Sequence, residues 1–125
     1  MDYYVKDILG VVINNDNFRH VIKTGEEMQV VVMSLLPGED IGTEIHEHNE
    51  QLLVAVEGSG MVVVDGVEND FNEGDMVLVR AGHEHNFINT GATDLKIITI
   101  YSPPHHKDDT IHKIKAEAEE DMASE

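Results

Sequence analysis

Two segments of this chain combine histidines, an acid and an amide at spacings that suit one site. The first reads Gly38-x5-Glu44-x-His46-x4-Gln51-x6-Gly58, and the second reads Gly74-x5-Arg80-x-Gly82-x2-His85-x3-Asn89. Side chains two residues apart on a strand face the same way, so Glu44 and His46 share a face. Imidazole nitrogens with a carboxylate and an amide oxygen suit a divalent transition metal. The predicted ligands are Glu44, His46, Gln51 and His85.

These spacings resemble the two signature motifs of the cupin superfamily. The usual first motif is Gly, five residues, His-x-His, three or four residues, Glu, six residues and Gly. The usual second motif is Gly, five residues, Pro-x-Gly, two residues, His, three residues and Asn. Here Glu44 replaces the first histidine, Gln51 the glutamate and Arg80 the proline. Arg80 either brings a cation to the barrel mouth or points outward into solvent.

Further stretches resemble a small single-domain cupin group often described as mannose-6-phosphate isomerase-like. They are Pro37–Gly42, Ala81–Gly82, His85–Asn86 and Ile100–His106, within a likeness running from about Phe18 to Lys115. The resemblance implies an all-β double-stranded β-helix, or jelly-roll, barrel and sugar or keto-acid substrates. It also implies a homodimer, in which Asp7–Ile13 either crosses to the partner as a strand or covers a sheet edge.

The pattern of short apolar runs between turn residues is typical of such a barrel. We expect strands over 28–36, 44–48, 51–56, 61–64, 76–79, 86–89 and 95–101, with a hairpin at Asp65-Gly66. Only Ile111–Met122 could form a helix. We therefore expect one domain over residues 1–125, with a barrel at about 18–104 and a C-terminal helix or tail over 105–125.

His48 leaves two alignments of the first motif open. In one, the ligands are Glu44, His46, Gln51 and His85, and every spacing fits. In the other, His46-x-His48 is the ligand pair, which leaves only two residues before Gln51 and requires a strand bulge. The remaining histidines are interpreted as surface residues, with His83 near the pocket rim; they are His20, His83, His105, His106 and His112.

Four protein ligands leave one or two positions open on an ion that takes five or six, so we expect one Mn, Fe, Co, Ni or Zn ion. One hypothesis is an isomerase- or lyase-type enzyme in which the ion polarises a small oxygenated substrate and His48 or Tyr101 transfers a proton. A second is a mononuclear iron dioxygenase, since two histidines and one carboxylate make up its triad. A third is a metal-dependent binding protein without catalysis.

Composition narrows the partners. The chain has 25 acidic and 8 basic residues and a formal charge of −17, which disfavours nucleic acid and anionic membranes. It has no cysteine, and therefore no disulfide and no thiolate ligand. The first residues lack the basic and apolar regions of a signal peptide, and no apolar run is long enough to span a membrane. We expect a cytoplasmic protein that binds a small molecule.

Overall fold

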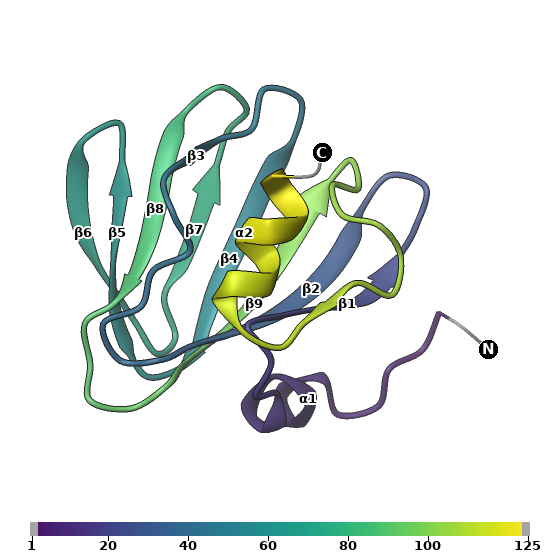
Figure 1. Ribbon diagram of the computed structural model, residues 1–125, viewed down its shortest axis with the longest axis horizontal. Coiled ribbons are helices and arrows are strands. Elements are labelled where there is room, and N and C mark those ends of the chain that lie inside the picture. The colour runs from purple at the N-terminus through teal and green to yellow at the C-terminus, as the bar shows by residue number, and fades with distance from the viewer. Residues whose placement is uncertain (1–2, 124–125) are drawn as a thin grey trace.

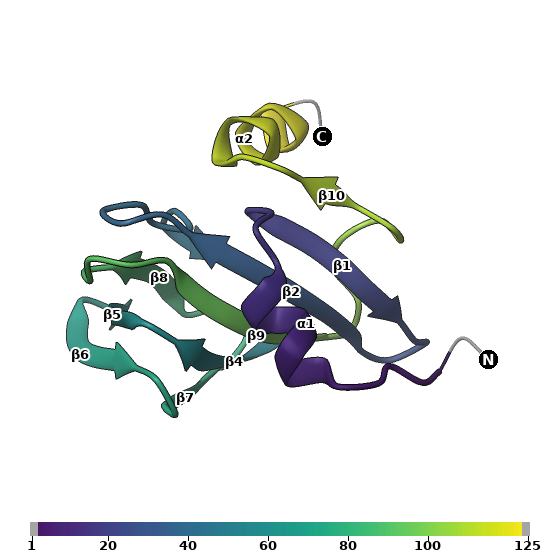
Figure 2. The same cartoon turned by 90° about the horizontal axis from the view of Figure 1, so that it is seen from below.

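Two antiparallel sheets face each other in the computed structural model, which describes residues 3–123 (Figures 1 and 2). The larger sheet has six strands in the order β10-β1-β2-β9-β4-β7, and the smaller has four in the order β3-β8-β5-β6. The strands are β1 (Arg19–Thr24), β2 (Gln29–Leu35), β3 (Glu44–Ile45), β4 (Glu50–Glu57), β5 (Ser59–Val64), β6 (Val67–Asn72), β7 (Met76–Val79), β8 (Glu84–Asn89), β9 (Leu95–Ser102) and β10 (Ile111–His112). The predicted all-β jelly-roll fold is confirmed.

Strand periodicity builds the core between the sheets. On β4, Leu53 and Ala55 are fully buried while the alternating Leu52 and Val54 are only partly covered. This two-residue period separates the inner from the outer face of a strand. The larger sheet contributes Met33, Leu35, Leu95 and Ile97 to the core, and the smaller sheet contributes Val62, Phe71 and Phe87. The inward polar side chains of the same strands form the site.

The Asp65-Gly66 hairpin joins β5 to β6 as predicted. Both turn residues have positive φ, 50° at Asp65 and 81° at Gly66, and Val64 pairs with Val67 across the turn. Positive φ at both central positions is typical of a type I′ turn, whose twist matches that of the flanking strands. Gly66 tolerates this conformation because it has no Cβ.

The N-terminal segment is a helix and not the crossing strand that was one of the two alternatives for Asp7–Ile13. Helix α1 spans Ile8–Asn14, and the Asp7 side chain accepts a hydrogen bond from the Gly10 N–H at its start. Apolar residues at helical spacing turn Val12 inward, while Leu9 stays 58% exposed. The helix packs against β2, β4 and β9, and so covers the part of the outer face of the larger sheet that these strands form, leaving β7 uncovered.

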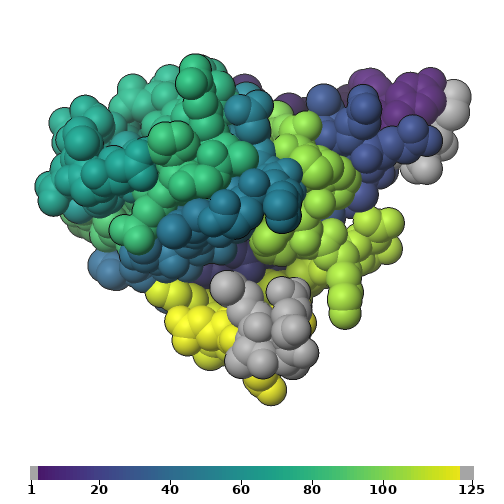
Figure 3. All heavy atoms as spheres, turned by 90° about the horizontal axis from the view of Figure 1, so that it is seen from above, coloured from purple at the N-terminus to yellow at the C-terminus, as the bar shows by residue number. Residues whose placement is uncertain are grey.

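The C-terminal segment extends the larger sheet beyond the expected barrel end. Strand β10 pairs with β1, placing His112 opposite Arg19, and helix α2 (Lys115–Ala123) follows. Helix α2 and β10 lie on the opposite side of the molecule from α1 (Figure 2). In the space-filling view, α2 forms a ridge beside the segment that follows β9 (Figure 3). These elements wall one side of the site.

Candidate metal centre

The two sequence motifs meet where β3 pairs with β8. Glu44 and His85 are directly opposite each other in this pairing, and His46 follows β3. One ligand atom from each of Glu44, His46 and His85 lies within 4.8 Å of the other two. The Nε2 of His46 lies 3.7 Å from the Oε2 of Glu44. Both histidines are buried, and the side chain of Glu44 is 15% exposed.

Backbone hydrogen bonds orient the two histidines. The Nδ1 of His85 donates to the carbonyl of His83 at 2.9 Å, because a carbonyl can only accept. The Nε2 of His85 therefore carries a lone pair, as a metal ligand requires. Gly82, at a φ of 86°, donates its N–H to the His46 carbonyl at 2.9 Å. This bond ties the second motif to the first next to both ligands.

Gln51 reaches the same region from the larger sheet. It pairs with Tyr101 across β4 and β9, with Thr99 diagonally placed on the same face. Its Nε2 donates to Thr99 Oγ1 and to Tyr101 O–H, each at 3.1 Å. Both amide hydrogens are thereby used, and the amide orientation is fixed. The Oε1 of Gln51 is buried and has no hydrogen-bond partner among the described residues.

The donor set fits a cation. Buried side-chain atoms without a hydrogen-bond partner in the described chain include His46 Nε2, His85 Nε2 and Gln51 Oε1. Each such buried polar atom costs about 1–3 kcal/mol when it has no partner. The Glu44 carboxylate lies with the two histidines and adds an acceptor, so a cation would compensate this group of atoms. Two imidazoles, a carboxylate and an amide suit a divalent transition metal.

Burial shifts the pKa of both Glu44 and His46 toward the neutral form. Burial raises the pKa of Glu44, and the neighbouring Arg19 and His85 oppose this rise. Burial lowers the pKa of His46 to about 4, and the neighbouring His105, His85 and Arg19 lower it further. His46 is therefore neutral at pH 7 and can offer its lone pair. A bound cation would favour the charged form of Glu44.

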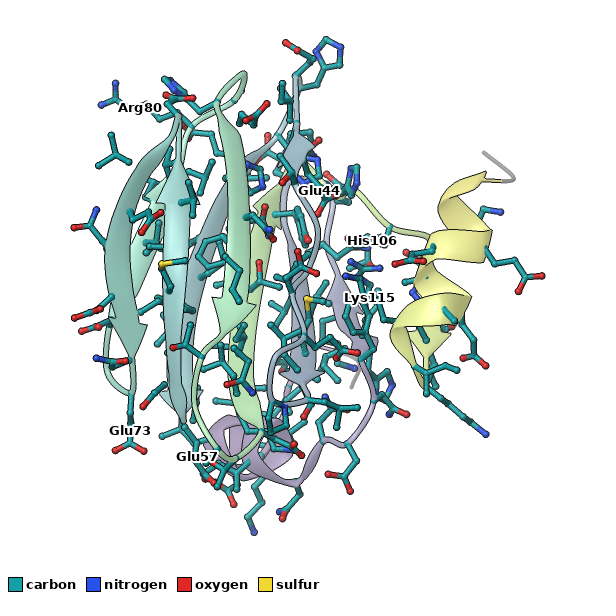
Figure 4. All side chains as sticks on the ribbon, turned by 60° about the vertical axis from the view of Figure 1, so that its left-hand side comes forward. Glu44, Glu57, Glu73, Arg80, His106 and Lys115 are labelled. Atoms are coloured by element: carbon teal, nitrogen blue, oxygen red, sulfur yellow. The ribbon has the colours of Figure 1, made fainter. Side chains whose placement is uncertain are left out.

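A cavity of about 350 Å³ opens beside the ligands. It is lined by Arg19, Thr43, Glu44, Ile45, His46, His105, His106, His112 and Asp121. Glu44 and His106 lie on the side of the barrel that faces α2, whereas Glu57 and Glu73 lie at the opposite end (Figure 4). This volume is at the lower end of the range for small-molecule sites.

His105 and His106 both line the cavity; His105 is exposed, as interpreted from the sequence, whereas His106 is half-buried, contrary to its interpretation as a surface histidine. The His105 ring lies 4.5 Å from the His46 ring, centroid to centroid, and the Nε2 of His106 is buried without a hydrogen-bond partner. Gln29 fixes their backbone: its Oε1 accepts from both N–H groups, and its Nε2 donates to the His106 carbonyl. No local sequence signal marks Gln29, because its partners are about 75 residues away.

The two predicted proton-transfer residues occupy different environments. Tyr101 is 1% exposed and accepts a hydrogen bond from Gln51. Burial raises the pKa of its phenol, which therefore stays protonated. His48 is exposed, in the bend after His46, and does not line the cavity beside Glu44. Arg80 is also exposed and lies outside this cavity, so the outward alternative holds (Figure 4).

The chain belongs to the Cupin domain family, which matches residues 31–101. Protein YrkC of Bacillus subtilis strain 168 is 42% identical over 110 residues, covering 83% of this chain. The crystal structure of BH2720 from Bacillus halodurans superposes with a TM-score of 0.93 at 37% identity, over 94% of each chain. An oxalate-binding protein of Thermotoga maritima is 29% identical over 68 residues, 54% of this chain and 56% of that protein.

The match spans 59% of the length of YrkC, so these comparisons assign a domain family and its fold. Both signature motifs lie within the matched residues 31–101. Among the described residues, neither helix is long and apolar enough to cross a membrane.

Proposed function

We propose that this protein is a metalloenzyme of the cupin family acting on a small oxygenated substrate. Glu44, His46, Gln51 and His85 would hold one Mn, Fe, Co, Ni or Zn ion. The observation that carries the proposal is the cluster of buried lone-pair atoms that have no donor within residues 3–123. A structural role alone would favour satisfied or apolar side chains at these positions, because unpartnered polar groups are destabilising.

The reaction class that the site supports best is isomerase- or lyase-type proton transfer. A bound divalent ion supplies Lewis acidity toward a carbonyl or hydroxyl oxygen. Tyr101 orients the Gln51 amide, and Gln29 holds the loop of His105 and His106 over the cavity. Burial lowers the pKa of His106 and keeps its ring neutral, so its unpartnered Nε2 can form a hydrogen bond with a bound substrate. His106 lines the cavity and His48 does not, so His106 rather than His48 would contact a bound substrate.

The substrate class follows from the size and polarity of the cavity. A volume of about 350 Å³ lined by histidines, a carboxylate and Arg19 suits a sugar or a keto or hydroxy acid. The match to a protein named for oxalate binding supports the acid.

One observation favours an iron dioxygenase as the second candidate. The residues Glu44, His46 and His85, which lie together, are one carboxylate and two histidines. This is the composition of the facial triad of non-haem iron oxygenases. Gln51 as a fourth ligand would leave less room for both O₂ and a chelating substrate. The isomerase- or lyase-type reading therefore stays first.

Deuterium exchange and oxygen uptake measured on the same samples separate the candidates. Protein loaded with Zn²⁺, Mn²⁺ or Fe²⁺ is incubated in D₂O with hydroxy acids, keto acids and sugars, and substrate C–H exchange is followed by NMR. Metal-dependent exchange that His85→Ala abolishes supports proton transfer. Substrate-dependent oxygen consumption that occurs only in the Fe²⁺-loaded protein supports the dioxygenase. Binding without either reaction would leave a metal-dependent binding protein, and the enzyme proposal would be wrong.

We also propose a homodimer that uses the outer face of the larger sheet. Met76 and Leu78 are 62% and 54% exposed on β7, an edge strand of that sheet. Exposed apolar side chains on a sheet edge favour association with another chain. Sedimentation velocity is expected to show a dimer that Leu78→Glu dissociates; a monomeric wild-type protein would contradict this assembly.

A further inference from the structure

Arg19 is a buried cation at the wall of the cavity. It begins β1, is 3% exposed and lines the cavity together with Glu44 and His106. Its Nε is buried and has no hydrogen-bond partner among residues 3–123. A buried guanidinium without a bonded carboxylate is destabilising, because the lost hydration of the charge is not replaced.

Lys96, the other buried basic residue among those described, has hydrogen-bond acceptors for its charged group. All eight lysines and arginines lie in the described part of the chain, and only Arg19 and Lys96 are buried. The Nζ of Lys96 donates to the Asn15 carbonyl, Ser34 Oγ and the Asp16 carboxylate, at 2.6, 3.0 and 3.2 Å. Lys96 therefore has a structural role that accounts for its burial. Arg19 lacks an equivalent set of acceptors.

The C-terminal elements hold Arg19 in place. Because β10 pairs with β1, His112 lies opposite Arg19, and its Nδ1 accepts from Arg19 Nη1 at 3.2 Å. The other ring nitrogen of His112, Nε2, donates to Asp121 on α2 at 2.9 Å. Asp121 thus selects the tautomer in which His112 Nδ1 is an acceptor. This chain orients the guanidinium and leaves its Nε edge without a partner.

We propose that Arg19 is a carboxylate-binding residue and that the ligand is a small hydroxy or oxo monocarboxylate. The carboxylate of this ligand would pair with Arg19, and its hydroxy or oxo oxygen would face the proposed metal ligands. The inference rests on the proposed metal site and names the substrate class for it. An Nε–H and Nη–H edge of arginine matches the two oxygens of a carboxylate.

The charge of the cavity supports a monoanion. With both carboxylates ionised, Glu44 and Asp121 outweigh Arg19 by one negative charge at the cavity wall. A divalent ion changes this to one net positive charge, which a single carboxylate balances. A carboxylate should therefore bind to the metal-loaded protein and be repelled by the metal-free protein. A neutral sugar would not depend on Arg19 in this way.

Calorimetry on Co²⁺-loaded protein tests the proposal with three pairs of probes. Glycolate, lactate and 3-hydroxybutyrate are each compared with the corresponding neutral amide. We expect at least one carboxylate to bind about 10- to 100-fold more tightly than its amide, the range for a charge-assisted hydrogen-bonded pair. Arg19→Gln should abolish this preference without weakening Co²⁺ binding. The exposed Arg80→Gln, which changes the charge equally, should retain it.

Each outcome separates the carboxylate subsite from the metal site. If wild-type protein binds Co²⁺ but none of the carboxylates more tightly than its amide, the subsite is wrong and the metal site stands. If Arg19→Gln still prefers a carboxylate over its amide, the carboxylate subsite is likewise wrong and the metal site stands. If Co²⁺ does not bind, both proposals fail. Should Arg19→Gln not fold, Arg19→Lys keeps the charge and loses the two-pronged geometry, and a retained preference would again contradict the role of Arg19.

Discussion

Replacing Gln51 by methionine should have little effect on the metal-free protein and a large effect on metal binding. The change removes two hydrogen bonds, to Thr99 and Tyr101, worth about 1 kcal/mol each. It also removes the unpartnered Oε1, whose burial costs about 1–3 kcal/mol. Because these contributions oppose each other, we expect the free energy of unfolding without metal to change by no more than about 1 kcal/mol.

Gln29 provides the matched control because it is also a fully buried glutamine on the larger sheet. Its amide bonds to Thr24 Oγ1, to the His106 carbonyl and to two backbone N–H groups. Gln29→Met leaves those groups without partners, so we expect a loss of about 3 kcal/mol or more. The contrast between two glutamines isolates the unpartnered oxygen of Gln51.

Gln51→Met should have its large effect on the stabilisation that bound metal provides. An ion at about 100 times its Kd stabilises the wild-type protein by about 2.7 kcal/mol. Loss of a ligand should weaken binding by at least about tenfold, since even residues that only support a ligand contribute 10- to 100-fold. The stabilisation then falls to about 1.4 kcal/mol or less. With about 2.1 cal/mol/K of unfolding entropy per residue, the metal-induced rise in Tm shrinks by about 5 °C or more.

Urea unfolding with and without Zn²⁺ measures all three proteins. Metal-free Gln51→Met that is as unstable as Gln29→Met would refute the reasoning, because Oε1 would then be satisfied without a metal. An unchanged Zn²⁺-induced stabilisation in Gln51→Met would refute it as well.

Three further outcomes follow from the same geometry. Tyr101→Phe should lower metal affinity about tenfold by releasing the Gln51 amide; if excess metal restores occupancy without restoring activity, Tyr101 transfers a proton instead. Because the pKa of His46 is lowered to about 4, the metal-free protein should keep its full free energy of unfolding above pH 6.5 and lose part of it as the pH falls from 6.5 toward 4. Urea titrations should show a smaller dependence of this free energy on pH in His46→Gln; an equal dependence would exclude His46 as its source. Gly82→Ala and Gly66→Ala, at φ of 86° and 81°, should each lower the free energy of unfolding by about 1 kcal/mol or more. Only Gly82→Ala should also weaken metal binding, because the Gly82 N–H bonds to the His46 carbonyl; equal metal affinities of the two variants would contradict this coupling.

Strands with a strong local pattern were predictable, and strands defined by their neighbours were not. The valine-rich β2 and the Asp65-Gly66 hairpin follow from composition and turn chemistry. Strand β6 was missed because Val67–Asn72 is mostly polar and exposed, and only its pairing with β5 makes it a strand. The helix α1 was missed because a seven-residue apolar run does not distinguish a helix from a strand.

The cluster of Glu44, His46 and His85 was predictable because it depends on short spacings within two motifs. The period of a strand places Glu44 and His46 together, and the pairing of β3 with β8 brings His85 to them. Arg19, His106 and His112 could not be predicted, since they reach the cavity through long-range contacts. Arg19 meets His112 across 93 positions of sequence, and Gln29 fixes the His106 loop across 77. No local pattern encodes such contacts.

The most direct test of the metal site is the metal content of the purified protein and its single-residue variants. The wild-type protein and His48→Ala are expected to hold about one equivalent of a divalent transition metal, while Glu44→Ala, His46→Ala and His85→Ala hold little. Loss of metal in His48→Ala with retention in Glu44→Ala would favour His46-x-His48 as the ligand pair. Wild-type protein that neither contains metal nor takes it up on titration would contradict the metal site altogether.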